Sequence, residues 1–310
     1  MSFAFIFPGQ GSQSVGMLSE LAENNPVVTD TFAEASSALG YDLWALVQNG
    51  PAEALNQTDR TQPAMLTAGV ACWRVWQQQG GPNPSMMAGH SLGEYTALVC
   101  SDAMSLADGA GLVADRGRFM QQAVAAGEGA MAAVLGMDDE AVIELCRDAA
   151  DGEVLSAVNF NSPGQVVIAG NTVAVERATV MAKERGAKRA IVLPVSVPSH
   201  CSLMTPAAEK LQERLSAITI TAPGIAVINN ADVEAPSAPE QIKQALVKQL
   251  SSPVRWVETI NRMSADGVIS AIECGPGKVL AGLNKRINKQ FPAYPLFDSA
   301  SLAAALEAVS

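Results

Sequence analysis

The sequence predicts an α/β protein in which a large domain, residues 1–125 and 196–310, is interrupted by a small domain, residues 126–195. Short apolar runs, typical of buried strands, alternate with segments of helical periodicity along most of the chain. Between 126 and 195 the expected order becomes strand, helix, strand, strand, helix, strand, which is typical of a ferredoxin-like unit. A length of 310 residues suits one large domain with such an insertion.

The first part of the large domain opens on the apolar run "FAFIF", which Pro8 ends, so we expect a short buried strand there. Segments with apolar residues three and four apart follow, interrupted by a second apolar run, "SMMAG". The expected elements are a strand at 3–7, helices at 17–39 and 61–80, a strand at 85–89, and helices at 92–100 and 105–124.

The same two patterns predict the rest of the chain. In the small domain we expect strands at 130–136, 153–160, 165–170 and 188–195, and helices at 138–150 and 173–186. After it we expect helices at 203–217, 238–250 and 253–265, strands at 224–230 and 267–273, a helix from 279, and a short final strand that closes the chain.

Composition excludes several classes of function. A formal net charge of −11 argues against nucleic-acid binding, which needs a surplus of Lys and Arg. The five cysteines lack C-x-x-C spacing, so we expect buried free thiols in a reducing compartment, and no residues have metal-ligand spacing. The N-terminus lacks the basic segment of a signal peptide, and no apolar run reaches the roughly 18 residues of a membrane span. We therefore expect a cytoplasmic protein without metal or membrane contacts.

The stretch "GHSLGEY", residues 89–95, places Ser91 between Gly89 and Gly93. G-x-S-x-G forms the nucleophile elbow of many serine esterases, where a sharp turn between a strand and a helix exposes the serine. The expected strand before Gly89 and helix after Ser91 supply this context. Ser91 is therefore a candidate nucleophile, and the motif leaves open whether water or another acceptor removes the acyl group.

A serine nucleophile needs a base, and the chain has only two histidines, His90 and His200. His90 directly precedes Ser91, so the turn directs its ring away from the serine hydroxyl. His200, in the proline-rich stretch "VSVPSHC", is the remaining candidate for general base. Cys201 beside it is an alternative nucleophile, but it lacks an elbow and is more simply a small buried residue.

The third member of a triad is not evident. An α/β-hydrolase orders its triad as serine, acid, histidine, with the histidine near the end of the chain. Here 110 residues, 310 minus 200, still follow His200, which argues against the ordinary hydrolase topology. The group that orients His200 could be a backbone or a side-chain carbonyl, and the residues alone name none.

Two glycine-rich turns require separate interpretations. The loop "FPGQGSQ" after the first strand resembles a dinucleotide-binding fingerprint, but Ser14 stands where the third glycine belongs. Such a turn can also direct backbone N–H groups at a developing oxyanion. The stretch "CGPGK", residues 274–278, lacks phosphate-loop spacing and indicates a turn from strand to helix.

Arg116 lies in the expected helix at 105–124, on the border of its apolar stripe between Val113 and Met120. Arg118 lies about 200° further around the same helix, on the polar face. One guanidinium is therefore expected to point inward, where it needs an anion. That anion is either an internal Asp or Glu, or the carboxylate of a substrate held by two hydrogen bonds.

Six ordered stretches spread over nearly the whole chain resemble one family, the malonyl-CoA:acyl-carrier-protein transacylases of bacterial type II fatty-acid synthesis. They are "FPGQGSQ", "GHSLGEY", "RGRFMQ", "VNFNSPGQVVIAG", "PVSVPSHC" and "ECGPGKVL". The resemblance implies an α/β-hydrolase-like large subdomain with a parallel sheet and an inserted ferredoxin-like small subdomain. It also implies that the malonyl group of malonyl-CoA passes through a malonyl-serine to the phosphopantetheine thiol of acyl carrier protein, by ping-pong kinetics and without a cofactor.

The resemblance also implies roles for individual residues. The implied roles are Ser91 as the acylated serine, His200 as general base, Gln10 and Leu92 as backbone oxyanion donors, Arg116 as partner of the malonyl carboxylate, Gln249 as the glutamine whose carbonyl orients the histidine, and Gln62 and Asn159 as pocket-lining residues. Around Gln249 this chain departs from the family, with Ser251-Ser252-Pro253 in place of Tyr-Asn-Pro.

The carrier protein of this family is strongly acidic, so a basic face is expected on this acidic chain. The candidate docking residues are Lys188, Arg189, Lys285 and Arg286, with Lys183, Arg185, Lys278 and Lys289 as further members of the same basic segments. Two other functions use the same residues: a serine thioesterase or hydrolase, and a non-catalytic module that binds carrier protein.

Overall fold

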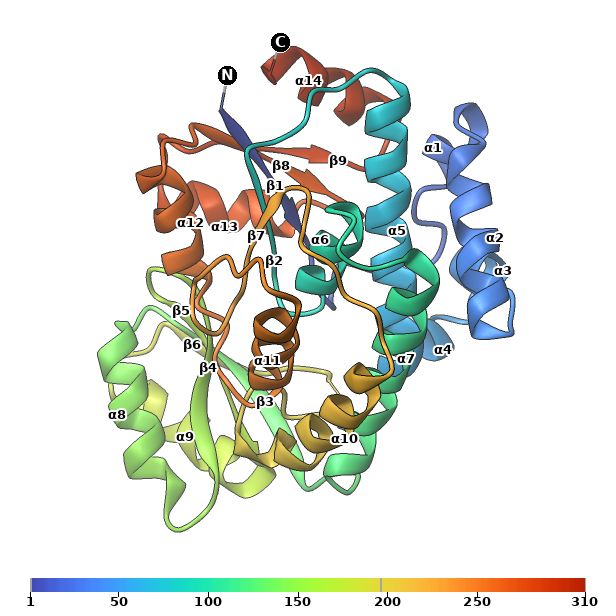
Figure 1. The fold of residues 1–310 in the computed structure, drawn as a ribbon. Coiled ribbons are helices and arrows are strands. Elements are labelled where there is room, and N and C mark those ends of the chain that lie inside the picture. Colours follow the sequence, from blue (N-terminus) through green and yellow to red (C-terminus); the bar gives the residue numbers. More distant parts are fainter. Residues whose placement is uncertain (1, 196, 310) are drawn as a thin grey trace.

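The computed structural model describes residues 2–195 and 197–309, which form a mixed α/β fold with two separate sheets (Figure 1). The first sheet is parallel throughout, with strand order β7-β2-β1-β8-β9. Its strands are β1 Phe3–Phe7, β2 Met86–Gly89, β7 Ala226–Ile228, β8 Ser270–Cys274 and β9 Ala293–Leu296. An adjacent pair of central strands, β1 and β2, ends at the loops that the sequence singled out, after Phe7 and after Gly89.

Helices cover both faces of the parallel sheet, because its central strand is apolar on both sides. Phe3, Phe5 and Phe7 point into one core cluster, and Ala4 and Ile6 into another. The helices around this sheet are α1 Ser19–Asn24, α2 Val27–Leu39, α3 Leu43–Asn49, α4 Ala52–Leu55, α5 Thr58–Gln78, α6 Gly93–Cys100, α7 Leu106–Ala123, α10 Thr205–Ser216 (after a 3₁₀ turn, Ser202–Met204), α11 Pro239–Leu250, α12 Trp256–Ala265, α13 Val279–Ile287 and α14 Ser299–Val309.

The second sheet is antiparallel, with strand order β4-β5-β3-β6. It consists of β3 Gly129–Leu135, β4 Leu155–Ser162, β5 Gln165–Asn171 and β6 Arg189–Val192, with helices α8 Asp139–Ala150 and α9 Thr172–Glu184. One face packs on α8 and α9 through residues such as Val142 and Val175. The opposite face carries Met131 and Val167, which pack with Cys201 of the following segment. This second face is therefore available to form one wall of a site.

Backbone contacts attach the small sheet to the rest of the chain beside the first sheet. The N–H of Phe160 in β4 donates to the carbonyl of Val254 at 3.0 Å, and the N–H of Val254 donates to the carbonyl of Val158 at 2.8 Å. The residue between them in β4 is Asn159, which this bridge holds against the segment between α11 and α12. Among the described residues, no helix has the length and apolarity to cross a membrane.

The end of the chain differs from its predicted form. We expected a final strand to close it, but β9 is followed by α14. The segment 299–309 is rich in alanine, and Leu302, Ala305 and Val309 are buried on one side of it. The short helices α3 and α4 were likewise not predicted, because seven and four residues give too little periodicity to detect. The turn at 274–278 leads from β8 into α13, as expected.

Candidate active site

The G-x-S-x-G stretch forms a strand-turn-helix corner between β2 and α6, with Ser91 at a backbone φ of +52°. A Cβ on Gly89 would lie 1.8 Å from the backbone carbon of Gly93, and a Cβ on Gly93 would lie 2.1 Å from the carbonyl oxygen of Phe7. Both glycines are therefore required by the close approach of β1, β2 and α6. The strained backbone at Ser91 holds its hydroxyl at the turn.

We expect Gly89→Ala to lower the free energy of unfolding by more than about 4 kcal/mol, because backbone atoms would have to move apart. Urea unfolding measures this change. The control is Gly111→Ala in α7, where an added Cβ would meet only Arg214 Nη2, at 3.8 Å. Alanine there is expected to raise helix stability by about 0.5–1 kcal/mol. A Gly89→Ala protein as stable as the control would contradict the packing described here.

Ser91 and His200 form a dyad although 109 residues separate them. Ser91 Oγ lies 2.7 Å from His200 Nε2, and His200 Nδ1 lies 2.8 Å from the backbone carbonyl oxygen of Gln249. Because a carbonyl only accepts, Nδ1 carries the proton and Nε2 is left to accept from the serine hydroxyl. Burial, and secondly the nearby Arg116 guanidinium, lower the pKa of His200 to about 3. The imidazole is therefore neutral at neutral pH, as a general base must be.

His90 does not compete for the serine proton. Its Nε2 lies 2.8 Å from Oδ1 of Asn161, and its ring lies near Trp256, with centroids 5.5 Å apart. Cys201, the other nucleophile considered, is buried, and its Sγ lies 3.2 Å from the carbonyl oxygen of Pro198. Burial raises the pKa of this thiol to about 11, so it is protonated at neutral pH.

Two backbone N–H groups of the Ser91 pocket lack an acceptor among the described residues. Gln10, in the loop after β1, and Leu92, which directly precedes α6, line the same pocket as Ser91. Neither N–H group donates a hydrogen bond to any residue within 2–195 and 197–309. Leu92 also lies at the N-terminal end of α6, where the helix dipole favours negative charge.

Arg116 is 1% exposed and reaches the dyad. Its Nη1 donates to Gln62 Oε1 at 2.7 Å, and its Nη2 donates to Gln249 Oε1 at 3.0 Å and to Ser91 Oγ at 3.4 Å. The guanidinium carbon lies 5.2 Å from the centre of the Tyr95 ring. All three hydrogen-bond partners are neutral oxygens, and no described carboxylate forms an ion pair with Arg116.

The geometry of Arg116 bears on the two anions that the sequence left open. An internal Asp or Glu in direct contact is absent from the described residues, and Nε of Arg116 is buried without a hydrogen-bond partner among them. Arg118, two residues on, is on the outside of α7 and pairs with Asp115 at 2.7 Å. The helical phase thus predicted correctly which arginine points inward.

A pocket of about 500 Å³ opens over the dyad, between the two sheets. Asn159 lines it, and its Oδ1 has no hydrogen-bond partner among the described residues. Gln62 and Gln249 do not line the pocket: they are buried behind Arg116 and hold its guanidinium. For Gln62 this differs from the expected pocket-lining position. The apolar wall of the pocket comprises Met120, Met131, Val167, Leu193, Pro194, Val195 and Val197.

Asn230, which the sequence analysis missed, clamps the serine turn. Its Oδ1 accepts from the N–H of Ser91 at 2.6 Å, and its Nδ2 donates to the carbonyl of Gly89 at 2.7 Å. It follows β7, the strand next to β2, so both lie at the carboxyl end of the parallel sheet. The available signal was a polar residue at the carboxyl end of the strand predicted at 224–230, because sites gather at this edge.

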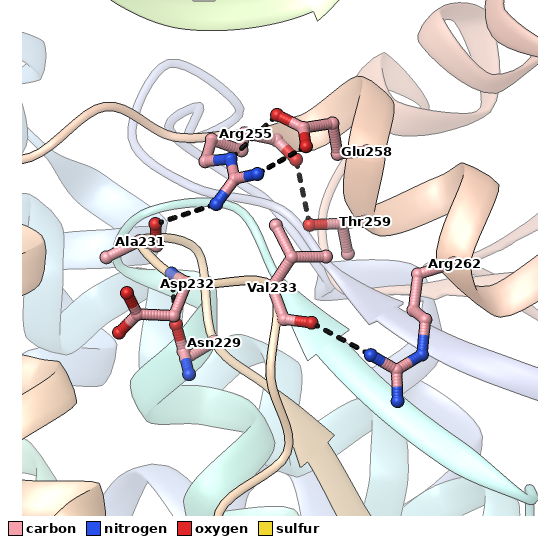
Figure 2. Close-up of polar contacts among 8 residues, drawn as sticks. All are labelled: Asn229, Ala231, Asp232, Val233, Arg255, Glu258, Thr259 and Arg262. Carbon is pink, nitrogen blue, oxygen red and sulfur yellow. Dashed lines mark hydrogen bonds and ion pairs between the residues drawn. The ribbon is translucent and has the colours of Figure 1, made fainter.

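The loop that carries Asn230 is itself anchored on α12, as Figure 2 shows. Arg255 Nη1 donates to the carbonyl of Ala231 at 3.4 Å, and Arg262 Nη1 donates to the carbonyl of Val233 at 3.3 Å. Val233 has a φ of +60°, a strained value for a β-branched residue. These contacts fix the backbone of the residues that follow Asn230.

The four candidate docking residues, Lys188, Arg189, Lys285 and Arg286, lie together on the surface. Arg286 in α13 donates from Nη1 to Gln165 Oε1 at 2.6 Å. Gln165 is paired across the sheet with Leu135, and Leu135 is paired in turn with Arg189. Lys188 and Lys285 are the adjacent residues in sequence. All four are exposed, and none forms an ion pair with a described residue.

Comparison with known proteins places this geometry in a family. A malonyl CoA-acyl carrier protein transacylase of Escherichia coli K12 is 59% identical over 305 residues, 98% of this chain and 99% of the relative. A relative of the same name from Bacillus subtilis is 46% identical, over 98% and 96% of the two chains. The crystal structure of an acyl carrier protein S-malonyltransferase from Vibrio cholerae is 61% identical and superposes with a TM-score of 0.96, over 98% of this chain and 100% of that one.

A further structure is a malonyl-transacylase in complex with its type II PKS acyl-carrier protein, 55% identical to this chain, with a TM-score of 0.98 over 99% of this chain and 100% of that chain. Residues 4–296, most of the chain, match the acyl transferase domain family. With this match and relatives of 59% identity along nearly their whole lengths, the chain belongs to the acyl transferase domain family.

Proposed function

We propose that this protein transfers the malonyl group from malonyl-CoA to the phosphopantetheine thiol of acyl carrier protein, which supplies extension units for fatty-acid synthesis. The observation that carries the proposal is a buried Arg116 whose hydrogen bonds to described residues all go to neutral oxygens, and whose Nη2 lies 3.4 Å from Oγ of Ser91. In a malonyl thioester one methylene separates the carboxylate from the reacting carbonyl carbon. A cation beside the nucleophile therefore fits that substrate, and the names of the relatives agree with it.

In the first half-reaction, His200 Nε2 takes the proton of Ser91 as Oγ attacks the thioester carbon. The negative oxygen that forms faces the N–H groups of Gln10 and Leu92. The carbon–sulfur bond then breaks, and the CoA sulfur leaves with the proton that His200 returns. General-base catalysis contributes about 10²–10⁴-fold, and an oxyanion donor roughly 2.7–4 kcal/mol.

The second half-reaction uses the same groups in reverse. The carrier-protein thiol gives its proton to His200 and attacks the ester carbon of malonyl-Ser91. The ester bond breaks, the serine oxygen regains the proton, and the malonyl thioester leaves on the carrier protein. Because one site serves both steps, ping-pong kinetics are expected. His200 carries the transferred protons, and Ser91 and the two thiols carry the malonyl group. We therefore propose that no cofactor takes part.

Water must be kept from the malonyl-serine between the two steps. We propose that the pair between Arg116 and the malonyl carboxylate holds the acyl group across the approach that water would need. A thiol that enters on a long arm is aligned along the pocket instead. Rapid hydrolysis of the malonyl-enzyme without carrier protein would contradict this part of the proposal and favour a thioesterase.

Intact-protein mass spectrometry tests the function directly. After mixing with malonyl-CoA, the protein is expected to gain the mass of one malonyl group, and to lose it when holo carrier protein is added. Steady turnover of malonyl-CoA without carrier protein would indicate a hydrolase. Failure to form any adduct would favour a non-catalytic module that binds carrier protein.

The finer architecture is part of the same proposal. We assign residues 1–125 and 196–310 to an α/β-hydrolase-like subdomain, and 126–195 to a ferredoxin-like subdomain. The five-stranded parallel sheet supports the first assignment, and the β4-β5-β3-β6 order with two helices on one face supports the second. Five buried free thiols agree with a reducing compartment, and we place the protein in the cytoplasm.

We propose the basic surface of Lys188, Arg189, Lys285 and Arg286 as the docking site for carrier protein. Arg189 begins β6, and the chain reaches the pocket wall at Leu193, four residues on. At strand spacing, the distance from Arg189 to Leu193 is roughly 13 Å. The extended prosthetic arm of a carrier protein docked at Arg189 has to span this distance to reach the pocket. A surface of unpaired positive charge there complements an acidic partner.

Reversing one charge in this surface is expected to weaken docking. We expect Arg189→Glu or Arg286→Glu to raise the KM for carrier protein several-fold at low ionic strength, with the KM for malonyl-CoA unchanged. The difference should shrink in high salt, because exposed charges are screened. The control is Lys210→Glu, an exposed lysine in α10 outside the surface. An equal KM in all three variants and the wild type would reject the surface.

A further inference from the structure

Glu94 is a carboxylate buried directly behind the proposed catalytic groups. It lies in the first turn of α6, three residues after Ser91, and is 2% exposed. Its Oε2 accepts from Gln249 Nε2 at 2.8 Å and from the backbone N–H of Asn230 at 2.8 Å. Glu94 thus joins α6, the end of α11 and the loop after β7, the elements that surround the serine turn.

The side-chain amide of Gln249 lies between Glu94 and the site. Its Nε2 donates to Glu94 Oε2 and to the carbonyl oxygen of Ser91, the latter at 3.0 Å, while its Oε1 accepts from Arg116 Nη2. A carboxylate and a carbonyl only accept, and a guanidinium only donates. One orientation of the Gln249 amide satisfies all three partners. Of its two acceptors, the Glu94 carboxylate forms the stronger hydrogen bond because it is charged.

The same residue, Gln249, holds the catalytic base with its backbone carbonyl, 2.8 Å from His200 Nδ1. A rotation of Gln249 would therefore disturb Arg116 through the side chain and could disturb His200 through the backbone. Asn230, the second partner of Glu94, clamps both sides of the Ser91 turn. Two paths thus lead from one buried carboxylate to the reacting groups.

We infer that Glu94 is a positioning residue of the acyl-transfer site, which acts through the Gln249 amide to hold Arg116 against Ser91 and through Asn230 to hold the serine turn. The inference rests on the proposed function, because the rate it concerns is that of malonyl transfer.

The buried negative charge of Glu94 destabilises the folded protein. The positioning role explains why a charged residue is placed there nonetheless. Burial raises its pKa to about 7, against the lowering by its two hydrogen bonds and by Arg116. Arg116, Tyr95 and Asp232 are the titratable or charged groups that act on it. Between pH 4.5 and 7 the folded chain keeps a proton that the unfolded chain has lost, so stability falls as the pH rises through this window. Removing the charge should therefore stabilise the protein at pH 8.

The experiment compares Glu94→Gln and Glu94→Ala with the wild type. Malonyl-serine formation and transfer to holo carrier protein are followed at saturating malonyl-CoA from pH 5.5 to 8.5. We expect Glu94→Ala to lower kcat by about 10–100-fold, the cost of a misplaced reacting group. Glu94→Gln keeps an acceptor oxygen and should lose less. The decline of wild-type kcat below about pH 7 should be absent in Glu94→Gln, while its Tm at pH 8 is not below that of the wild type.

The matched control is Glu273→Gln. Glu273 is fully buried in β8, accepts from the N–H groups of Leu280 and Ala281, and has a pKa that burial also raises to about 7. It contacts none of the proposed catalytic groups among the described residues, so this variant should keep the wild-type rate and pH profile. The comparison separates the effect of losing any buried carboxylate charge from the effect of losing the charge of Glu94.

A double-mutant cycle tests the path through Gln249. If Glu94 acts through this amide, adding Glu94→Ala to Gln249→Ala should lower kcat little further. The remaining loss, about two- to threefold, is the effect of Glu94 that passes through Asn230. Fully additive losses, a Glu94→Ala kcat within twofold of wild type, or a Glu94→Gln protein with the wild-type acid decline would each overturn the inference. A wild-type protein that forms no malonyl-serine would refute the proposed function instead.

Discussion

Replacing Ser91 by alanine is expected to abolish the malonyl-enzyme and to lower the rate of malonyl transfer by about 10⁶-fold, the loss measured when a serine nucleophile is removed from another enzyme. The substitution takes away the oxygen that lies 2.7 Å from His200 Nε2. His200→Ala should cost a similar factor, and the double variant no more, because nucleophile and base act as one unit. Mass spectrometry and single-turnover transfer to carrier protein measure both quantities.

The control for this substitution is Ser101→Ala. Ser101 directly follows α6 and is 1% exposed, and its Oγ donates to the carbonyl of Leu98. Losing that hydroxyl should cost about 1 kcal/mol of stability and leave acyl transfer intact. If Ser91→Ala still gained a malonyl group, another nucleophile would have to carry it. The first residue to replace would then be Cys201, although burial raises the pKa of its thiol.

Replacing Arg116 by alanine is expected to change which acyl group is transferred. The variant should lose about 3–5 kcal/mol of malonyl transition-state stabilisation, or roughly 150- to 5,000-fold in kcat/KM. Transfer of acetyl groups should suffer far less, because in the wild type a neutral acyl group leaves the buried guanidinium without its anion. The ratio of kcat/KM for malonyl-CoA to that for acetyl-CoA measures the effect and should fall by about 100-fold.

Arg118→Ala is the matched control, since it removes the same side chain from the same helix. Arg118 points outward and pairs with Asp115 at 2.7 Å, so its loss should leave the ratio unchanged. A malonyl preference that survived in Arg116→Ala would show that another group recognises the carboxylate. Asn159, which lines the same pocket and can donate from its side-chain amide nitrogen to a carboxylate, would be examined next.

The fold was largely predictable because its elements carry local patterns. The apolar run at 3–7 is β1, and the glycine spacing at 89–93 is the corner between β2 and α6. Prediction failed where local pattern is weak. The short helices α3 and α4 contain few residues, and the alanines of α14 give little contrast between its faces.

The site was predictable from residue identity in part. With two histidines in the chain, elimination led to His200, and the helical phase of Arg116 predicted that it points inward. The resemblance to a family named Gln10, Leu92 and Gln249, which neither spacing nor composition would have found. Gln62 was expected in the pocket, and lies instead behind the guanidinium, which it holds.

The sequence by itself determined which residues can do the chemistry: a serine in an elbow, a neutral base, and a cation on an apolar helix face. The tertiary structure alone decided how they are held. Ser91 and Asn230 are 139 positions apart, and Glu94 and Gln249 are 155 apart. Periodicity reports the environment of one helix or strand. These hydrogen bonds depend instead on which strand and helix ends the parallel sheet and its helices bring together, and no local pattern encodes that.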